Sequence, residues 1–273
     1  MINDILKNIL RDQVEDKDVA VLLSGGVDSL SVAFAAEEIG LTVHAYSFHL
    51  DNHLSYDYQK AEEAASKFNW NFTGVTIPTA NLKDDFRQLV ELGCKKKTHF
   101  ECVYPFLYVY PKIAQRFVLS GWAADGYYGI SKKAMMHYRE TQELFDTFRN
   151  DYFQPNMRAG YNWHMKVVEM HNKIFVTPYL DEEVKNFFYS KSWEELNKPY
   201  QKHHVRDAFP QFEKLGKVKN HLNLQIDSKV NDLFEVLLND SEINFKKRKR
   251  IMDICRDWSS LNTTGNSLEE FLT

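Results

Sequence analysis

The segment of residues 19–29 constrains the fold most, because it joins a buried strand directly to a glycine turn and a helix. Its first five residues are apolar, which is typical of a parallel strand covered on both faces. The Ser-Gly-Gly turn at 24–26 lets the backbone bend tightly and present successive N–H groups. A helix expected over about 28–39 points the positive end of its dipole at the same place. The segment therefore predicts a binding site for phosphate.

This turn differs from the commoner phosphate-binding loop, because it is shorter and no Gly-Lys-Ser/Thr ends it. The sequence SGGVDS at 24–29 instead resembles the signature of the PP-loop ATP pyrophosphatases, which cleave ATP between the α- and β-phosphates. The alternative is a turn that uses glycine only for its positive φ. The strand, turn and helix around the signature favour the nucleotide-binding interpretation.

Composition sets wide limits on the class of protein. The 273 residues, 44% of them hydrophobic, suffice for one large α/β domain or for a domain with a smaller helical one. A net charge of −4 does not favour nucleic acid as a partner. The three cysteines form no CxxC pair, which argues against a structural zinc site and fits a reducing compartment. Without a signal peptide or a long apolar run, we expect a soluble cytoplasmic protein with no membrane partner.

Strands and helices alternate over the first half of the chain. Strands are expected at 19–23, 41–48, 72–77 and 117–120, and helices at 28–39, 58–68, 81–92 and 105–115. The last helix is expected to be kinked or interrupted at Pro111. This alternation predicts an α/β fold with a parallel sheet flanked by helices. Beyond residue 130 the pattern becomes helical, with candidates at 181–189, 203–212, 229–238 and 243–257. We therefore expect a nucleotide-binding core over 1–130 and a mostly helical C-terminal part over 131–273. The basic run at 246–250 is either a solvated helix face or a nucleic-acid contact.

A second informative segment, VLSGWAADGYYG at 118–129, follows the strand expected at 117–120. Together with SGGVDS, it resembles the synthetase domain of asparagine synthetases and their β-lactam synthetase relatives. TPYLD at 177–181 and KHHVRDAF at 202–209 resemble two further blocks of that family, in the family order. The resemblance implies an adenine nucleotide alpha hydrolase-like fold and an ATP-dependent enzyme.

The resemblance also implies which residues form the site. Asp28 and Asp125 match the metal-binding aspartates of the family, which implies Mg²⁺, although each alone could be a helix cap or a turn residue. The implied ATP-binding positions are Leu23, Ser24, Gly25, Gly26, Asp28, Ser29, Ser47, Ser120 and Gly121. Lys219, or Lys217 if the loop length differs, matches the lysine that steadies the departing pyrophosphate.

Lys202 and Arg206 are four positions apart and are expected to share one helix face. That face is either a contact for the polyphosphate or a solvated stripe, and the match to the family block favours the contact. We therefore count both residues, with Lys219, as candidate catalytic residues.

Three departures from the family pattern bear on which substrate we expect. Trp122 stands where asparagine synthetases have Glu, Ala123 replaces a Gly, and Gly126 replaces an acidic residue. An indole cannot accept a proton, so Trp122 is a wall for the substrate or ordinary packing. Aspartate as the substrate is therefore in doubt. Because the first strand begins by Val19, we expect no glutaminase in this chain, so nitrogen comes as free ammonia, from a separate glutaminase, or as an amine.

The function expected from these residues is that of an ATP-dependent, AMP-forming ligase. Such an enzyme adenylates a small-molecule carboxylate and transfers it to ammonia or an amine, and its cofactors are ATP and Mg²⁺. One alternative is a PP-loop enzyme that modifies a nucleobase or tRNA. Another is a catalytically silent ATP-binding protein, which the departures at Trp122 and Gly126 leave open.

Overall fold

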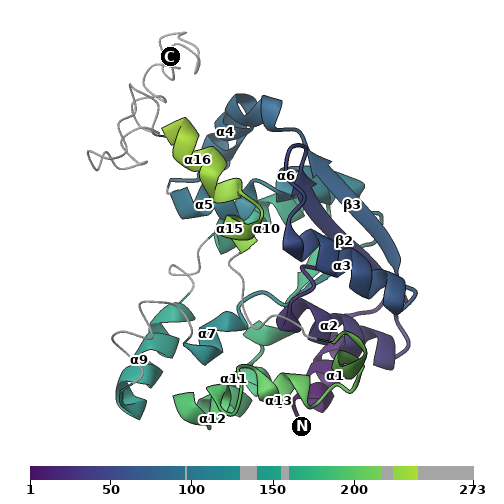
Figure 1. Ribbon diagram of the computed structural model, residues 1–273, viewed down its shortest axis with the longest axis vertical. Helices are drawn as coiled ribbons and strands as arrows, with labels where there is room; N and C mark the ends of the chain where they lie inside the picture. Colours follow the sequence, from purple (N-terminus) through teal and green to yellow (C-terminus); the bar gives the residue numbers. More distant parts are fainter. Residues whose placement is uncertain (96, 130–139, 155–159, 217–223, 239–273) are drawn as a thin grey trace.

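A computed structural model describes residues 1–95, 97–129, 140–154, 160–216 and 224–238, and its centre is a five-stranded sheet (Figure 1). The strands are β1 (Asp18–Leu22), β2 (Thr42–Leu50), β3 (Asn71–Ile77), β4 (Phe117–Ser120) and β5 (Ile174–Val176). They lie in the order β3-β2-β1-β4-β5, and each neighbouring pair is parallel. The expected α/β fold with a parallel sheet is confirmed. Because β1 pairs with β2 on one side and β4 on the other, the strand order reverses direction at β1.

Helices cover both faces of this sheet and enclose two hydrophobic cores (Figure 1). The first core packs against α1 (Ile2–Gln13), α2 (Val27–Glu38), α3 (Tyr56–Lys67), α7 (Asp125–Tyr128), α9 (Gln142–Tyr152), α11 (Glu182–Tyr189), α12 (Trp193–Asn197), α13 (His203–Arg206) and α14 (Gln211–Lys214). The second packs against α4 (Leu82–Glu91), α5 (Lys97–Val103), α6 (Phe106–Val109), α10 (Tyr161–Met170), α15 (Leu224–Asp227) and α16 (Val230–Leu238). Short 3₁₀ turns are η1 (Thr79–Asn81), η2 (Tyr110–Lys112) and η3 (Pro178–Leu180). Among these described residues, no helix is both long and apolar enough to cross a bilayer.

The apolar run in β1 is buried on both sides, as expected for a central parallel strand. Val19 and Val21 belong to the first core, whereas Ala20 between them belongs to the second. Successive side chains of a strand point to opposite faces, so a strand covered by helices on both faces needs an unbroken apolar sequence. Because β1 is buried on both faces, its end is held in place, and so is the start of the glycine turn that follows it.

The helix expected at 105–115 is interrupted at Pro111, as predicted, because α6 ends at Val109 and the η2 turn, which contains Pro111, follows it. A proline has no N–H and cannot continue a helix from within. The helix expected at 203–212 is likewise divided into α13 and α14, with Pro210 as the N-cap of α14.

A further difference is β5, a strand in the part expected to be mostly helical. Its residues pair with β4 in the central sheet, with Phe117 opposite Ile174. Residues from both sides of position 130 therefore build one sheet. The division of the chain into a core and a C-terminal part stays a proposal. The helix expected at 243–257 and the basic run at 246–250 lie outside the described residues.

Candidate active site

The candidate site lies at the carboxyl edge of the sheet, where β1 and β4 end side by side. Leu22 and Ser120 are the last residues of these strands and are paired in register. The glycine turn and the 121–124 loop therefore begin next to each other. Ligands of open parallel sheets bind at such a point, where the strand order reverses. A cavity of about 720 Å³ lies here, and residues of both loops line it.

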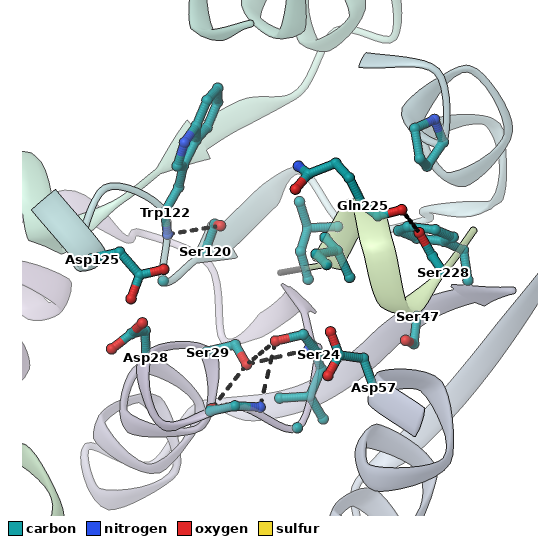
Figure 2. A pocket seen from close by; sticks show the side chains of 18 of the residues that line it. Ser24, Asp28, Ser29, Ser47, Asp57, Ser120, Trp122, Asp125, Gln225 and Ser228 are labelled. Atoms are coloured by element: carbon teal, nitrogen blue, oxygen red, sulfur yellow. Dashed lines mark hydrogen bonds between the residues drawn. The ribbon is translucent and has the colours of Figure 1, made fainter. Parts of the chain in front are cut away.

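The turn after β1 has the geometry of an anion cradle. Gly25 adopts φ +70°, and a Cβ there would lie 2.6 Å from Cβ of Lys60, so a side chain does not fit. Ser29 Oγ accepts a hydrogen bond from the N–H of Ser24 at 3.2 Å and donates to the carbonyl of Gly26 at 3.2 Å (Figure 2). Ser29 thus braces the turn from the first turn of α2. The N-cap of α2 is Gly26, which has no side chain to cover the helix N–H groups.

The loop after β4 packs directly against the start of α2. A Cβ on Gly121 would lie 2.4 Å from the carbonyl carbon of Asp28 and 2.6 Å from the nitrogen of Ser29. Only glycine fits at such a distance. The next residue, Trp122, donates its N–H to Ser120 Oγ at 3.2 Å, which turns the chain away from the strand. Gly121 therefore brings Asp28 and the residues after β4 together.

A group of two aspartates and one lysine lies beside the cradle. Nζ of Lys202 is 2.5 Å from Oδ2 of Asp28 and 2.6 Å from Oδ1 of Asp125. The Lys202 side chain is only 3% exposed, whereas that of Asp125 is 41% exposed. Figure 2 shows the two carboxylates facing each other, one from α2 and one from the start of α7. We call these three residues the Asp-Asp-Lys centre.

Charges in this centre influence one another strongly. Burial raises the pKa of Asp28 to about 6, although the Lys202 ammonium acts to lower it. Burial acts to lower the pKa of Lys202, but the two carboxylates outweigh this and hold that pKa above its ordinary value. The two carboxylates thus favour the charged form of Lys202. A buried ammonium between two carboxylates fixes their positions.

The carboxylates of this centre fit a magnesium ion. Oδ1 of Asp28 is buried and has no hydrogen-bond partner among the described residues. Carboxylate oxygens are preferred ligands of Mg²⁺, which usually takes one or two of them together with phosphate oxygens and water. The described residues contain no group of three or more His, Cys, Asp or Glu side chains able to hold a metal. A site with two protein ligands matches an ion that arrives with a nucleotide.

The remaining predicted residues are placed differently. Leu23 and Ser47 line the cavity, and the N–H of Leu23 donates to the carbonyl of Tyr46 at 2.8 Å. Arg206 is not among the described residues that line the cavity, and its guanidinium lies 5.3 Å from the ring centre of Tyr200. The expected shared helix face is wrong, because Lys202 precedes α13 with a left-handed φ of +61°. Lys217 and Lys219 lie outside the described residues.

The cavity also has walls that the sequence did not indicate. Gln225 and Ser228 lie across the cavity from the glycine turn, on and just after α15 (Figure 2). Asp227 anchors this segment, because its carboxylate accepts from the N–H of Asp57 at 2.8 Å and its carbonyl from His53 Nε2 at 2.7 Å. Tyr161 and His164 of α10 line the cavity as well. These residues belong to no recognisable motif. They lie far from the glycine turn in the sequence, so the sequence alone does not indicate that they line the same cavity.

The chain resembles known proteins in sequence and in structure. The family model described as asparagine synthase matches residues 1–212 of the 273. A comparison with curated proteins gives no match. Among solved structures, the chain is similar to an NMN synthetase from Francisella tularensis, with 19% identity over 75% of this chain and 94% of that one, and a TM-score of 0.37. It is also similar to a predicted subunit of tRNA methyltransferase from Methanocaldococcus jannaschii, with 15% identity over 64% and 75% of the two chains, and a TM-score of 0.34.

Proposed function

The chain belongs to the asparagine synthase family, and on that basis we propose that it adenylates a carboxylate with ATP and transfers the acyl group to ammonia or an amine. The observation that carries the proposal is the shared cavity at the ends of β1 and β4. There the glycine turn, the start of α2 and the Asp-Asp-Lys centre line one space of about 720 Å³. A space of this size is typical of sites for small molecules.

The glycine turn is the proposed site of the β- and γ-phosphates. Its backbone N–H groups and the start of α2 supply fixed partial positive charge without any basic side chain. Ser24 and Ser29 brace the turn through their hydroxyls, which are 3.2 Å apart. A pre-formed cradle costs little reorganisation when the nucleotide binds.

The Asp-Asp-Lys centre is the proposed site where charge on the polyphosphate is balanced. Asp28 and Asp125 would hold Mg²⁺, which when bound neutralises negative charge on the phosphates. The ammonium of Lys202 contacts both carboxylates and so holds them at the cavity edge. The two aspartates thus stay aligned although one belongs to α2 and the other to α7.

The proposed reaction has two steps. A carboxylate oxygen of the substrate attacks the α-phosphorus of ATP, an O–P bond forms, and the bond to the bridging oxygen of the β-phosphate breaks to release pyrophosphate. Ammonia or an amine then attacks the acyl carbon, loses a proton, and displaces AMP. The cavity contributes mainly by holding the carboxylate in line with the α-phosphorus. A separate glutaminase is one proposed source of the ammonia.

Exchange of labelled pyrophosphate into ATP tests the proposal. The first step is reversible, so a carboxylate substrate should make the protein incorporate labelled pyrophosphate into ATP when magnesium is present. Incorporation that depends on an added carboxylate supports the ligase function. A folded protein that binds ATP but shows no exchange with any of a broad panel of carboxylates would contradict it.

A further inference from the structure

One end of the cavity is walled by aromatic rings. The ring centre of Trp122 lies 5.0 Å from that of Tyr161, 5.1 Å from that of His164 and 6.1 Å from that of Phe175. Phe106 closes the group, with its ring centre 4.4 Å from that of His164. All five residues line the cavity. We call them the aromatic wall.

The aromatic wall is electrically neutral. His164 is 1% exposed, its Nε2 is 2.8 Å from the hydroxyl of Tyr110, and burial lowers its pKa to about 3. Burial therefore favours the uncharged form of its imidazole. A carboxylate or ammonium placed against these rings would lose its hydration without gaining a counter-charge.

Each lysine among the described residues that line the cavity is paired with a carboxylate. Nζ of Lys60 lies 2.5 Å from the carboxylate of Glu63, and Nζ of Lys97 lies 3.5 Å from that of Glu101. Lys202 is held by Asp28 and Asp125. An amino acid of the aspartate type would need a free cation for its second carboxylate. None of these three described lysines is free to provide one.

The aromatic wall adjoins the reacting centre. Trp122 lies in the loop that leads from β4 to Asp125 at the start of α7, and Figure 2 shows both side chains. Thr177 Oγ1 donates to the carbonyl of Trp122 at 2.9 Å, which fixes this part of the loop. A ring lying against Trp122 would therefore place an attached carboxylate near the centre where adenylation is proposed.

From these observations we propose that the substrate of the ligase is an aryl carboxylic acid whose ring lies against the aromatic wall. The inference rests on the function proposed above and specifies its substrate class. Aromatic rings attract one another in offset or edge-to-face arrangements beyond the effect of buried area. The wall should therefore distinguish an aryl acid from a saturated ring of similar size.

Calorimetric binding of three acids tests this inference in the full-length protein. Benzoate, cyclohexanecarboxylate and L-aspartate are titrated in the presence of α,β-methylene-ATP, which cannot release pyrophosphate. We expect benzoate to bind most tightly, and Trp122→Ala to weaken its binding on the order of tenfold. Trp163→Ala is the matched control, since Trp163 stacks on His99 and is not among the described residues lining the cavity. If Trp122→Ala fails to fold, Trp122→Leu gives the same comparison.

The outcomes separate the two proposals. Preferred binding of L-aspartate, equal binding of benzoate and cyclohexanecarboxylate, or benzoate affinity that Trp122 variants leave unchanged would each overturn the aryl assignment. Pyrophosphate exchange with L-aspartate but not with benzoate would overturn it as well, while leaving the ligase function intact. Benzoate binding that depends on Trp122, without exchange for any acid, would support the aromatic site and contradict the ligase function.

Discussion

The ammonium of Lys202 lies 2.5 Å from a carboxylate oxygen of Asp28, although 174 positions separate the two residues in the chain. The same ammonium is 2.6 Å from Asp125, 77 positions away. One buried cation therefore contacts the start of α2 and the start of α7, and it belongs to the residue before α13. This contact connects the three segments at the carboxyl edge of the sheet.

Removing the cation of Lys202 should destabilise the protein. In Lys202→Met the Asp28 carboxylate, which is 17% exposed, loses its counter-charge, and breaking a buried ion pair from one side costs about 3–5 kcal/mol. We expect denaturant unfolding to show a loss of this size. The control is Lys198→Met, because Lys198 pairs with Glu194 on the surface, where both side chains are more than 60% exposed. That change should cost less than about 1 kcal/mol. Equal losses in the two variants would show that Lys202 has no special structural role.

The fold could be predicted from the sequence where local patterns were long. β1 to β4 and the helices expected at 28–39, 58–68 and 81–92 follow apolar runs and helical spacing, and the structure confirms them. β5 has only three residues, which is too short for a periodic pattern, and its identity depends on pairing with β4. Whether such a short segment forms a strand depends on its packing against segments that are distant in the sequence.

The site could be predicted only in part for a similar reason. Glycine turns and aspartates at strand ends are local signals, so the sequence indicated the glycine turn and the two aspartates, which line one cavity. The buried state of Lys202 depends on two acidic partners far along the chain, and a lysine in a polar segment is normally solvated. The walls from α10 and α15 likewise became visible only once the chain was folded.

The two glycines of the turn should respond differently to substitution. Gly26 has φ −80°, and an added Cβ would meet only Ser24 Oγ at 3.3 Å, so Gly26→Val should fold. Its side chain would occupy the space where phosphate oxygens approach the backbone, and we expect ATP affinity to fall about tenfold or more. Gly25→Val should instead lower the melting temperature, because of its φ of +70° and its contact with Lys60. Wild-type ATP affinity in folded Gly26→Val would exclude the turn as the phosphate site.

Asp125→Asn should reduce turnover while the fold survives. The amide keeps an oxygen that can accept from Lys202 but loses the charge proposed to hold Mg²⁺. We expect kcat for pyrophosphate exchange to fall about a hundredfold and the magnesium requirement to shift to higher concentration. Unchanged turnover at low magnesium would make Asp125 only a partner of Lys202.

Asp85 should make stability depend on pH. It is 8% exposed, and burial raises its pKa to about 6 although Tyr108 donates to it at 2.7 Å. The unfolded chain has an Asp pKa of about 3.9, so the folded protein binds this proton more tightly and loses stability as pH rises from about 4 through 6.

Asp85→Asn should abolish that dependence and stabilise the protein at pH 7 by about 3 kcal/mol, with little effect near pH 4. The neighbouring Asp84→Asn is the control, because the Asp84 side chain is 82% exposed and pairs with Arg87 at the surface. Unfolding by urea at several pH values decides the question. A wild-type pH profile in Asp85→Asn would show that its carboxyl group ionises normally.

The identity of the nucleotide product tests the central claim most directly. ATP is incubated with magnesium, a carboxylate that supports exchange, and ammonium, and the nucleotides are separated by chromatography. Cleavage between the α- and β-phosphates predicts AMP and pyrophosphate in equal amounts, both dependent on the carboxylate. ADP and inorganic phosphate as the main products would contradict the assignment of the cavity to an AMP-forming ligase.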